Sequence, residues 1–245
     1  MTEVLQIGNR TIQASELIPL LASYQMLPQL LRELVIDEAI TPIEISPEEL
    51  AQAKQQFFNQ KQLKQEADIQ AWIESQGLSI NQVENFIARQ LKVEKFKQIT
   101  WGQKLESYFF QSKKKLDKVV YSLLRTQDIG LAQELYFRIQ AKEQSFADVA
   151  REYSQGPEAQ TGGLVGPIEL STLHPTMVQV LSSSQPGQIL PPARIAEWIA
   201  ILRVEKFIPA QLDEPMKARL LNELFEAWLQ EQQKQIKSLP NELDS

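Results

Sequence analysis

The sequence predicts an α+β protein in which a discontinuous all-α domain carries an inserted domain of element order β-α-α-β-α-β-β. Three observations predict this architecture. Apolar residues recur at helical spacing through most of the first 116 residues. A β-branched apolar run then begins a segment that alternates short strands and helices. An amphipathic helix expected at 214–237 has no apolar partner in that segment, so we expect it to pack on the N-terminal helices.

The N-terminal region is expected to begin with a hairpin and to continue as helices. Val4–Ile7 and Thr11-Ile12 flank Gly8-Asn9, which is typical of a tight turn. Ser46-Pro47-Glu48-Glu49 has the residue types of a helix start, with Ser as N-cap and Pro at the first position. Ser79 is a second expected N-cap. Apolar stripes along these helices predict one shared core.

Two polar patterns in this region have alternative interpretations. The basic run Lys113-Lys114-Lys115 is interpreted as a solvated hinge, and a binding patch is the alternative. The many Gln residues between 52 and 65 are interpreted as the exposed face of good helix formers. An aggregation-prone tract is the alternative, but Phe, Leu and Lys interrupt the Gln residues regularly.

The inserted segment is expected to span residues 117–208. Val119–Arg125 predicts a short buried strand, and 128–141 predicts a helix. Ser145 is an N-cap candidate for a second helix, which Gly156-Pro157 follows. Gly162-Gly163 permits tight backbone geometry before a strand that begins at Leu164. A helix at 172–183, a turn into an extended edge at 185–192 and a last strand at 197–204 complete the segment.

Composition excludes several classes of function. The chain of 245 residues has a net charge of −6, which argues against nucleic acid or an anionic membrane as the main partner. It contains no Cys and one His, so it has no disulfides and no thiolate nucleophile. Clustered carboxylates and a phosphate-binding loop are missing from the sequence pattern. We therefore expect neither a metal nor a cofactor.

The N-terminus shows no basic region followed by an apolar run, which is the pattern of a signal peptide. No apolar segment approaches the ~20 residues that a membrane-spanning helix needs. The expectation from these patterns is a cytoplasmic protein that does not insert into a membrane.

The stretch Ser145–Gly166, SFADVAREYSQGPEAQTGGLVG, resembles the middle of parvulin-type peptidyl-prolyl isomerases, whose pattern reads FxxLAxxYSxDxxxxxGGxLG. The helical ends around this segment resemble the SurA/PrsA foldases, in which parvulin domains are inserted into a helical chaperone body. The resemblance implies a helical domain at 1–116 plus 210–239, a rotamase domain at 117–208 and a tail at 240–245.

Parvulins carry two histidines and an Asp or Cys at the site, and the resemblance places these positions on other residues here. The first His position falls on Ser122, or on Tyr121 if the register slips by one, and these two are the candidate catalytic residues. The second His position falls near Ile199 and the Asp/Cys position on Gly156. The family's Thr position falls near Arg194.

The resemblance also implies a site for the proline ring of a substrate. The substrate-binding candidates are Leu173, His174, Met177, Gly163, Leu164 and Trp198. Leu173 and Met177 have a second interpretation as ordinary core residues at helical spacing. His174 has one as a solvent-facing residue before Pro175 at a helix start.

Three functions remain open. The first is a parvulin-type isomerase and foldase that binds extended, Pro-containing client segments and assists folding or secretion. The second is a holdase or secretion adaptor whose parvulin-like domain binds peptide without catalysis. The third is a helical interaction protein, such as a component of an export machine. The partners expected are unfolded client polypeptides and, for a role in export, a secretion apparatus.

Overall fold

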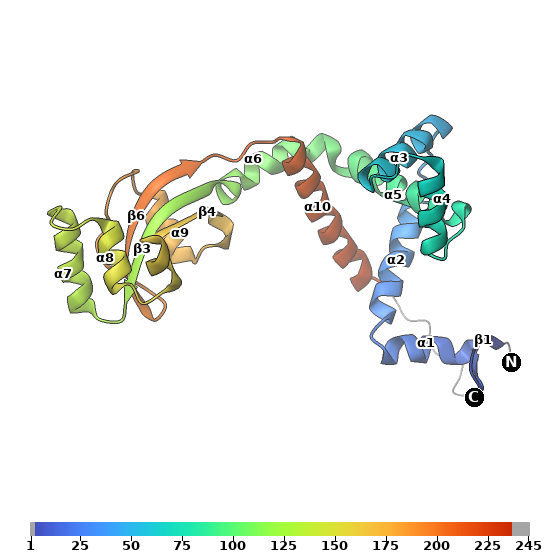
Figure 1. The fold of residues 1–245 in the computed structure, drawn as a ribbon, viewed down its shortest axis with the longest axis horizontal. Helices are drawn as coiled ribbons and strands as arrows, with labels where there is room; N and C mark the ends of the chain where they lie inside the picture. Colours follow the sequence, from blue (N-terminus) through green and yellow to red (C-terminus); the bar gives the residue numbers. More distant parts are fainter. Residues whose placement is uncertain (1–2, 237–245) are drawn as a thin grey trace. The chain divides into compact units, whose positions relative to one another are not determined.

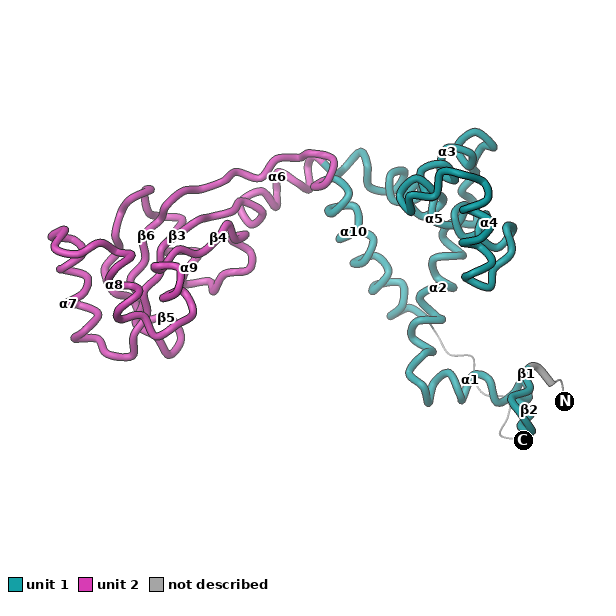
Figure 2. Tube along the Cα trace, viewed as in Figure 1, with its two compact units in different colours: residues 1–105, 217–245 teal, residues 106–216 magenta. Residues whose placement is uncertain are grey.

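The computed structural model describes residues 3–236. The chain divides into two compact units, shown in different colours in Figure 2. Unit 1 comprises residues 1–105 and 217–245, and unit 2 comprises residues 106–216. The α+β class predicted from the sequence is confirmed. The domain boundaries stay a prediction, because compactness alone does not define a part of the chain that folds by itself.

Unit 1 is helical apart from one small hairpin (Figure 1). The hairpin pairs its two strands antiparallel, close to the predicted positions. In chain order the elements are β1 (Glu3–Ile7), β2 (Arg10–Gln13), α1 (Ala14–Ser23), α2 (Leu27–Ile40), α3 (Pro47–Gln60), α4 (Glu66–Ser75), α5 (Ile80–Trp101), the 3-10 turn η1 (Gly102–Lys104) and α10 (Glu214–Lys234, whose first three residues belong to unit 2).

The last helix packs on the N-terminal helices, as the apolar stripe predicted. Phe225 and Leu229 of α10 form one buried cluster with Ile36 and Ile40 of α2. Aromatic rings from α5 and α10 surround this cluster, with ring centroids 5.1 to 6.2 Å apart: Phe96, Trp101, Phe225 and Trp228. Burial of these side chains holds residues from both ends of the sequence in one core.

Helices α3, α4 and α5 share a second core in unit 1. It is built from Phe58, Ile73, Val83 and Ile87, all nearly fully buried. The predicted N-caps are confirmed: the hydroxyls of Ser46 and Ser79 accept bonds from the main chain at the third helical residue. Glu49 and Gln82 complete two capping boxes at these helix starts.

Unit 2 contains the predicted order of strands and helices around an antiparallel sheet of order β4-β3-β6-β5 (Figure 1). The long pair β3–β6 runs from Lys118↔Ile208 to Thr126↔Ile199. The elements are α6 (Leu105–Leu116, whose first residue belongs to unit 1), β3 (Lys118–Thr126), α7 (Ile129–Gln140), α8 (Phe146–Tyr153), η2 (Pro157–Thr161), β4 (Leu164–Glu169), η3 (Leu170–Thr172), α9 (Pro175–Ser182), β5 (Ala193–Ile195) and β6 (Trp198–Ile208).

The two faces of this sheet carry separate cores. On one face Val119, Tyr121 and Leu202 pack with Leu181 of α9. On the other face Leu124 and Ile201 pack with the helices α7 and α8. A β-bulge at Glu205 shifts the β3–β6 register between Val120 and Tyr121. Successive residues of β3 point to opposite faces of the sheet, so they contact different cores.

Several predicted boundaries need correction. Residues 170–172 form a 3-10 turn, so the helix expected at 172–183 begins only at Pro175. The last strand runs to Ile208 because it stays paired with β3 to that point. The basic run Lys113-Lys114-Lys115, expected to be a solvated hinge, instead forms part of the last turn of α6, where positive charge favours the helix terminus. The last helix, expected to reach 237, ends at Lys234. The tail expected at 240–245 lies outside the described residues.

None of the described helices combines the length and apolar character required to span a bilayer.

Candidate functional site

The candidate site is the face of the unit 2 sheet that α9 covers. Buried Tyr121 of β3 belongs to this face. Leu123, Val165, Leu173 and Met177 are among the partly buried apolar side chains that pack against the same core cluster. They come from β3, β4 and α9 and from the turn before α9. The structure thus brings one catalytic candidate and two substrate-binding candidates to one apolar surface.

The two catalytic candidates, Ser122 and Tyr121, lie on opposite faces of the sheet. Ser122 donates a hydrogen bond of 2.5 Å from its hydroxyl to Glu205 Oε1. Arg203 Nε donates to the same oxygen over 2.7 Å, and its guanidinium lies 5.1 Å from the ring centroid of Phe146 on α8. The neighbours of Ser122 are therefore those of the α7–α8 face. Of the two, only Tyr121 shares a face with Leu173 and Met177.

Burial changes the acid–base behaviour of Tyr121. Removal of the phenol from water raises the pKa of Tyr121, and the negative charge of Glu158 raises it further. The positive charge of Arg125 acts in the opposite direction. A raised pKa keeps the hydroxyl protonated at neutral pH, so it can donate a hydrogen bond.

Beside Tyr121 lies a partly buried ion pair that the sequence patterns did not predict. Arg125 Nη2 donates to Glu158 Oε2 over 3.0 Å, and the Glu158 side chain is only 4% exposed. Ser154 donates its hydroxyl proton to Glu158 Oε1 over 2.6 Å and accepts a bond from the Arg125 main chain over 3.1 Å. Arg125 Nε is buried and has no partner among the described residues. These contacts give the site a fixed carboxylate and a fixed cation.

Gly156, the Asp/Cys position of the resemblance, makes room for this pair. A Cβ placed on Gly156 would lie 2.1 Å from Arg125 Nε and 2.3 Å from Glu158 Oε2. The Arg125 guanidinium thus fills the space that a side chain at 156 would take. A signal for it was present in the sequence, since Arg125 is a charged residue at the end of an apolar strand run.

The remaining substrate-binding candidates lie in different surroundings. His174 is exposed and caps α9, where its Nδ1 accepts a bond from Thr176 N over 3.3 Å. Trp198 is half-buried, and the Arg125 guanidinium lies 5.4 Å from its ring centroid. Leu164 is 52% exposed and pairs with Ser122 in the ladder. The roles assigned to these residues stay predictions.

Gly163 has a structural task next to the site. Its φ is +85°, and a Cβ there would lie 2.8 Å from the carbonyl oxygen of Leu123. The Gly163 carbonyl accepts a bond from Leu123 N over 2.8 Å. Only glycine allows this close approach of two backbones at a positive φ. The residue thereby sets how β4 enters the sheet beside the site.

No group of three or more His, Cys, Asp or Glu side chains within residues 3–236 is arranged to hold a metal ion. The chemistry that this face offers is apolar contact together with hydrogen bonds from fixed donors. Such a face suits a neutral, partly apolar group such as a prolyl imide better than a charged one.

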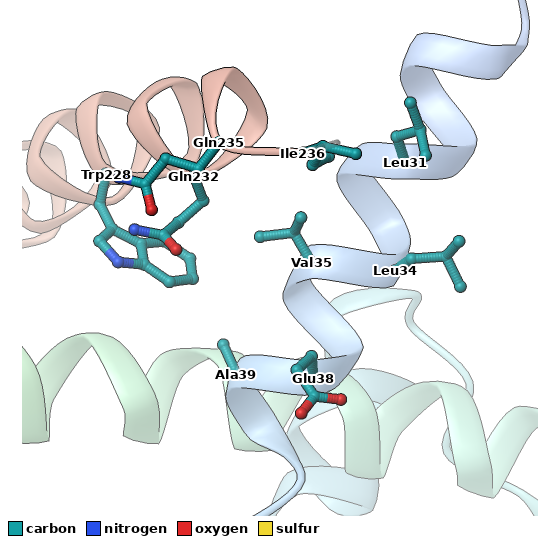
Figure 3. A pocket seen from close by; sticks show the side chains of 9 residues that line it. All are labelled: Leu31, Leu34, Val35, Glu38, Ala39, Trp228, Gln232, Gln235 and Ile236. Atoms are coloured by element: carbon teal, nitrogen blue, oxygen red, sulfur yellow. The ribbon is translucent and has the colours of Figure 1, made fainter. Parts of the chain in front are cut away.

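Unit 1 has a second concave surface, an apolar groove of about 540 Å³ between α2 and α10 (Figure 3). Leu31, Leu34 and Val35 line it from α2, and Trp228 lines it from α10. Leu34 is 53% exposed, so part of this apolar surface is open to solvent. A groove of this kind can take up apolar side chains of a polypeptide.

Comparison with known proteins places unit 2 in a family. A sequence profile described as "Rotamase: PPIC-type PPIASE domain" matches residues 123–206. A search of the curated proteins found no match. Residues 123–206 therefore resemble the PPIC-type domain of parvulins.

Solved structures resemble all or part of the chain. The PrsA peptidylprolyl isomerase of Bacillus cereus has a TM-score of 0.50 at 17% identity, over 99% of this chain and 95% of that chain. PrsA of Bacillus anthracis has a TM-score of 0.49 at 17% identity, over 86% and 99%. The parvulin domain of PpiD from E. coli has a TM-score of 0.34 at 22% identity, over 40% and 95%. The B. cereus structure indicates the same overall fold.

Proposed function

We propose that this chain is a parvulin-type peptidyl-prolyl cis-trans isomerase that acts as a foldase on extended, proline-containing polypeptides. One observation carries the proposal: residues 123–206 match the PPIC-type domain, and in the same unit an apolar sheet face holds a buried phenol. The family resemblance alone does not identify the residues that bind the substrate and stabilise the transition state. The geometry of the face supports a specific assignment of roles.

Isomerisation of a prolyl bond must overcome a barrier of ~18–20 kcal/mol that amide resonance sets. A catalyst needs no nucleophile, because it accelerates the reaction when it binds the twisted imide better than either planar isomer. In our assignment Leu173 and Met177 contact the proline ring. The Tyr121 hydroxyl donates to the substrate carbonyl oxygen, and the Arg125–Glu158 pair fixes the charges around that hydroxyl.

The helical unit supplies a surface for client binding in this proposal. The α2–α10 groove is apolar and opens to solvent at Leu34. An unfolded polypeptide offers the apolar side chains that such a groove excludes from water. Binding here would hold a client near the chain for longer than a short prolyl contact alone.

A holdase or adaptor without catalysis is the second candidate, and one observation favours it. The two histidine positions of the family fall on Ser122 and Ile199, and Ser122 is bonded to Glu205 away from the site face. The paired imidazoles of the family are therefore replaced, while the apolar face that could bind peptide is kept.

A coupled isomerisation assay on short Xaa-Pro peptides tests the proposal. We expect the wild type to exceed the uncatalysed rate, which has a time constant of tens to hundreds of seconds. Tyr121→Phe and the pair Leu173→Ala, Met177→Ala should return the rate toward background. Ser122→Ala is the matched control and should keep the wild-type rate, because Ser122 lies on the other face.

Aggregation of an unfolded client is measured in parallel. Wild-type rates at background together with suppressed aggregation would replace the isomerase by the holdase. Background rates without any effect on the client would leave a helical interaction protein. A rate that falls with Ser122→Ala and not with Tyr121→Phe would refute our assignment of the donor.

The cytoplasmic location and a link to a secretion apparatus stay part of this proposal. The similarity in fold to PrsA supports the link to a secretion apparatus. Cell fractionation tests the first. Co-purification of a secretion component with the tagged chain tests the second.

A further inference from the structure

An aromatic pocket lies among α3, α4 and α5 of unit 1, apart from the α2–α10 groove. Its volume is about 400 Å³. The ring centroid of Phe57 lies 5.8 Å from that of Trp72 and 6.1 Å from that of Phe86. Both pairs are in an edge-to-face arrangement. Each of the helices α3, α4 and α5 thus contributes one aromatic ring to the pocket.

The rim of this pocket exposes more apolar surface than a structural cluster needs. Phe86 is 50% exposed, and Leu78, which also lines the pocket, is 42% exposed. The core below is complete without them, because Phe58, Ile73, Val83 and Ile87 already fill it. Grouped exposed apolar residues beside a cavity are typical of an interaction surface.

Lys61 gives the pocket a positive charge. Its Nζ lies 5.2 Å from the ring centroid of Phe57 and 4.9 Å from that of Trp72. Other lysines of this unit, Lys54 and Lys95, are paired with Glu84 and Glu49. Within the described part of the chain Lys61 has no carboxylate partner, and none of the residues that line the pocket is acidic. The aromatic rings hold this cation in place without neutralising it.

We propose that this pocket binds acidic segments of extended polypeptides, with an aromatic or large aliphatic side chain in the cavity and a carboxylate on Lys61. Charge complementarity selects this occupant, because an unpaired cation above an apolar cavity favours a ligand that brings an anion beside an apolar group. The inference rests on the proposed function, since it names a chemical class of client for the helical unit.

A fluorescence anisotropy titration tests the inference on the full-length protein. The probes are two labelled flexible peptides without proline, each with one Phe, flanked by Asp in the first and by Lys in the second. We expect the Asp peptide to bind about threefold tighter than the Lys peptide. Lys61→Gln should abolish this preference, and Lys64→Gln, an exposed lysine outside the lining, should keep it.

A second pair of variants tests the apolar part. Phe86→Ser should weaken binding of the Asp peptide about tenfold, because the ring supplies apolar contact area. Phe110→Ser removes a Phe that is 62% exposed on α6 and should have no effect. Thermal melts by circular dichroism verify that each variant is folded.

Three results would overturn the inference. They are equal affinity for both peptides, a preference that survives Lys61→Gln, and a wild-type dimer that Phe86→Ser dissociates, since a second copy would then fill the pocket. The peptides contain no proline, so loss of isomerase activity would leave this titration unaffected. Failure of the isomerase proposal and failure of this inference are therefore distinguishable.

Discussion

Arg32 of α2 and Glu226 of α10 form a bidentate ion pair across unit 1. Arg32 Nη1 donates to Glu226 Oε2 over 2.8 Å, and Nη2 donates to Oε1 over 2.6 Å. The two residues are 194 positions apart in the sequence. The pair borders the buried cluster of α2 and α10, so it ties together the two helices that close the helical unit.

Glu226→Gln should make the stability of this unit less dependent on pH in the acidic range. The hydrogen bond from Arg32 lowers the pKa of Glu226. The ionised carboxylate therefore contributes its full stability at pH values above about 4.3, the ordinary pKa of a Glu side chain. That contribution is lost as the pH falls through the lowered pKa of the folded state. Because both side chains are partly exposed, we expect a loss of about 0.5 kcal/mol at neutral pH.

Urea unfolding across acidic pH measures the difference between Glu226→Gln and the wild type, which should shrink to zero in acid. Glu231→Gln on the same helix is the control, because Glu231 forms only an exposed i,i+3 pair with Lys234. A difference that is independent of pH would contradict the role of the ion pair.

Glu158→Ala should destabilise unit 2 by about 2 kcal/mol, since it leaves the Arg125 guanidinium and the Ser154 hydroxyl without their acceptor. Chemical denaturation measures the loss. Glu134→Ala removes an exposed i,i+4 partner of Arg138 and should cost at most about 0.5 kcal/mol. Equal losses of unfolding free energy for both variants would show that the Arg125–Glu158 pair contributes no more stability than an exposed ion pair.

Gly163→Ala should destabilise the chain by about 3 kcal/mol, from the strain of a positive φ together with the approach of Cβ to the Leu123 carbonyl. Gly187 is a matched control, because its φ is +82° and no atom lies within 4 Å of its Cβ position. Gly187→Ala should cost about 1 kcal/mol. The difference between the two, read from denaturation midpoints, isolates the effect of crowding.

Tyr121 should ionise later than an exposed tyrosine when the pH is raised. Burial raises its pKa, so the unfolded chain releases this proton first and stability falls as the pH rises above about 10. Phenolate absorbance of the native protein, which has five tyrosines, measures the titration. Tyr121→Phe should remove one ionisation step at high pH, and an unchanged titration curve would contradict the burial of this hydroxyl.

Sequence patterns predicted most of the fold because they report local physics. The caps at Ser46, Ser79 and Ser145 are short-range, and each was found where the residue types indicated. Apolar stripes predicted that α10 would return to α2. Boundaries were less accurate where a 3-10 turn replaced the first helical turn, as at residues 170–172.

The site was harder to predict because it depends on long-range pairing. The Arg125–Glu158 pair joins β3 to the 3-10 turn η2, 33 residues away, and neither residue shows its partner in the sequence. Which of Ser122 and Tyr121 faces α9 depends on the strand register near the bulge at Glu205. A one-residue change of register exchanges the two faces, and composition does not reveal it.

The discontinuous helical unit imposes an order on synthesis at the ribosome. All residues of unit 2 precede Lys217, so its sheet can close while the chain is still growing. Ile36 and Ile40 must wait for Phe225 and Leu229. The nascent chain therefore exposes an apolar strip on α2 through most of translation. A truncated product that stops before α10 keeps this strip exposed, and an exposed apolar surface favours aggregation.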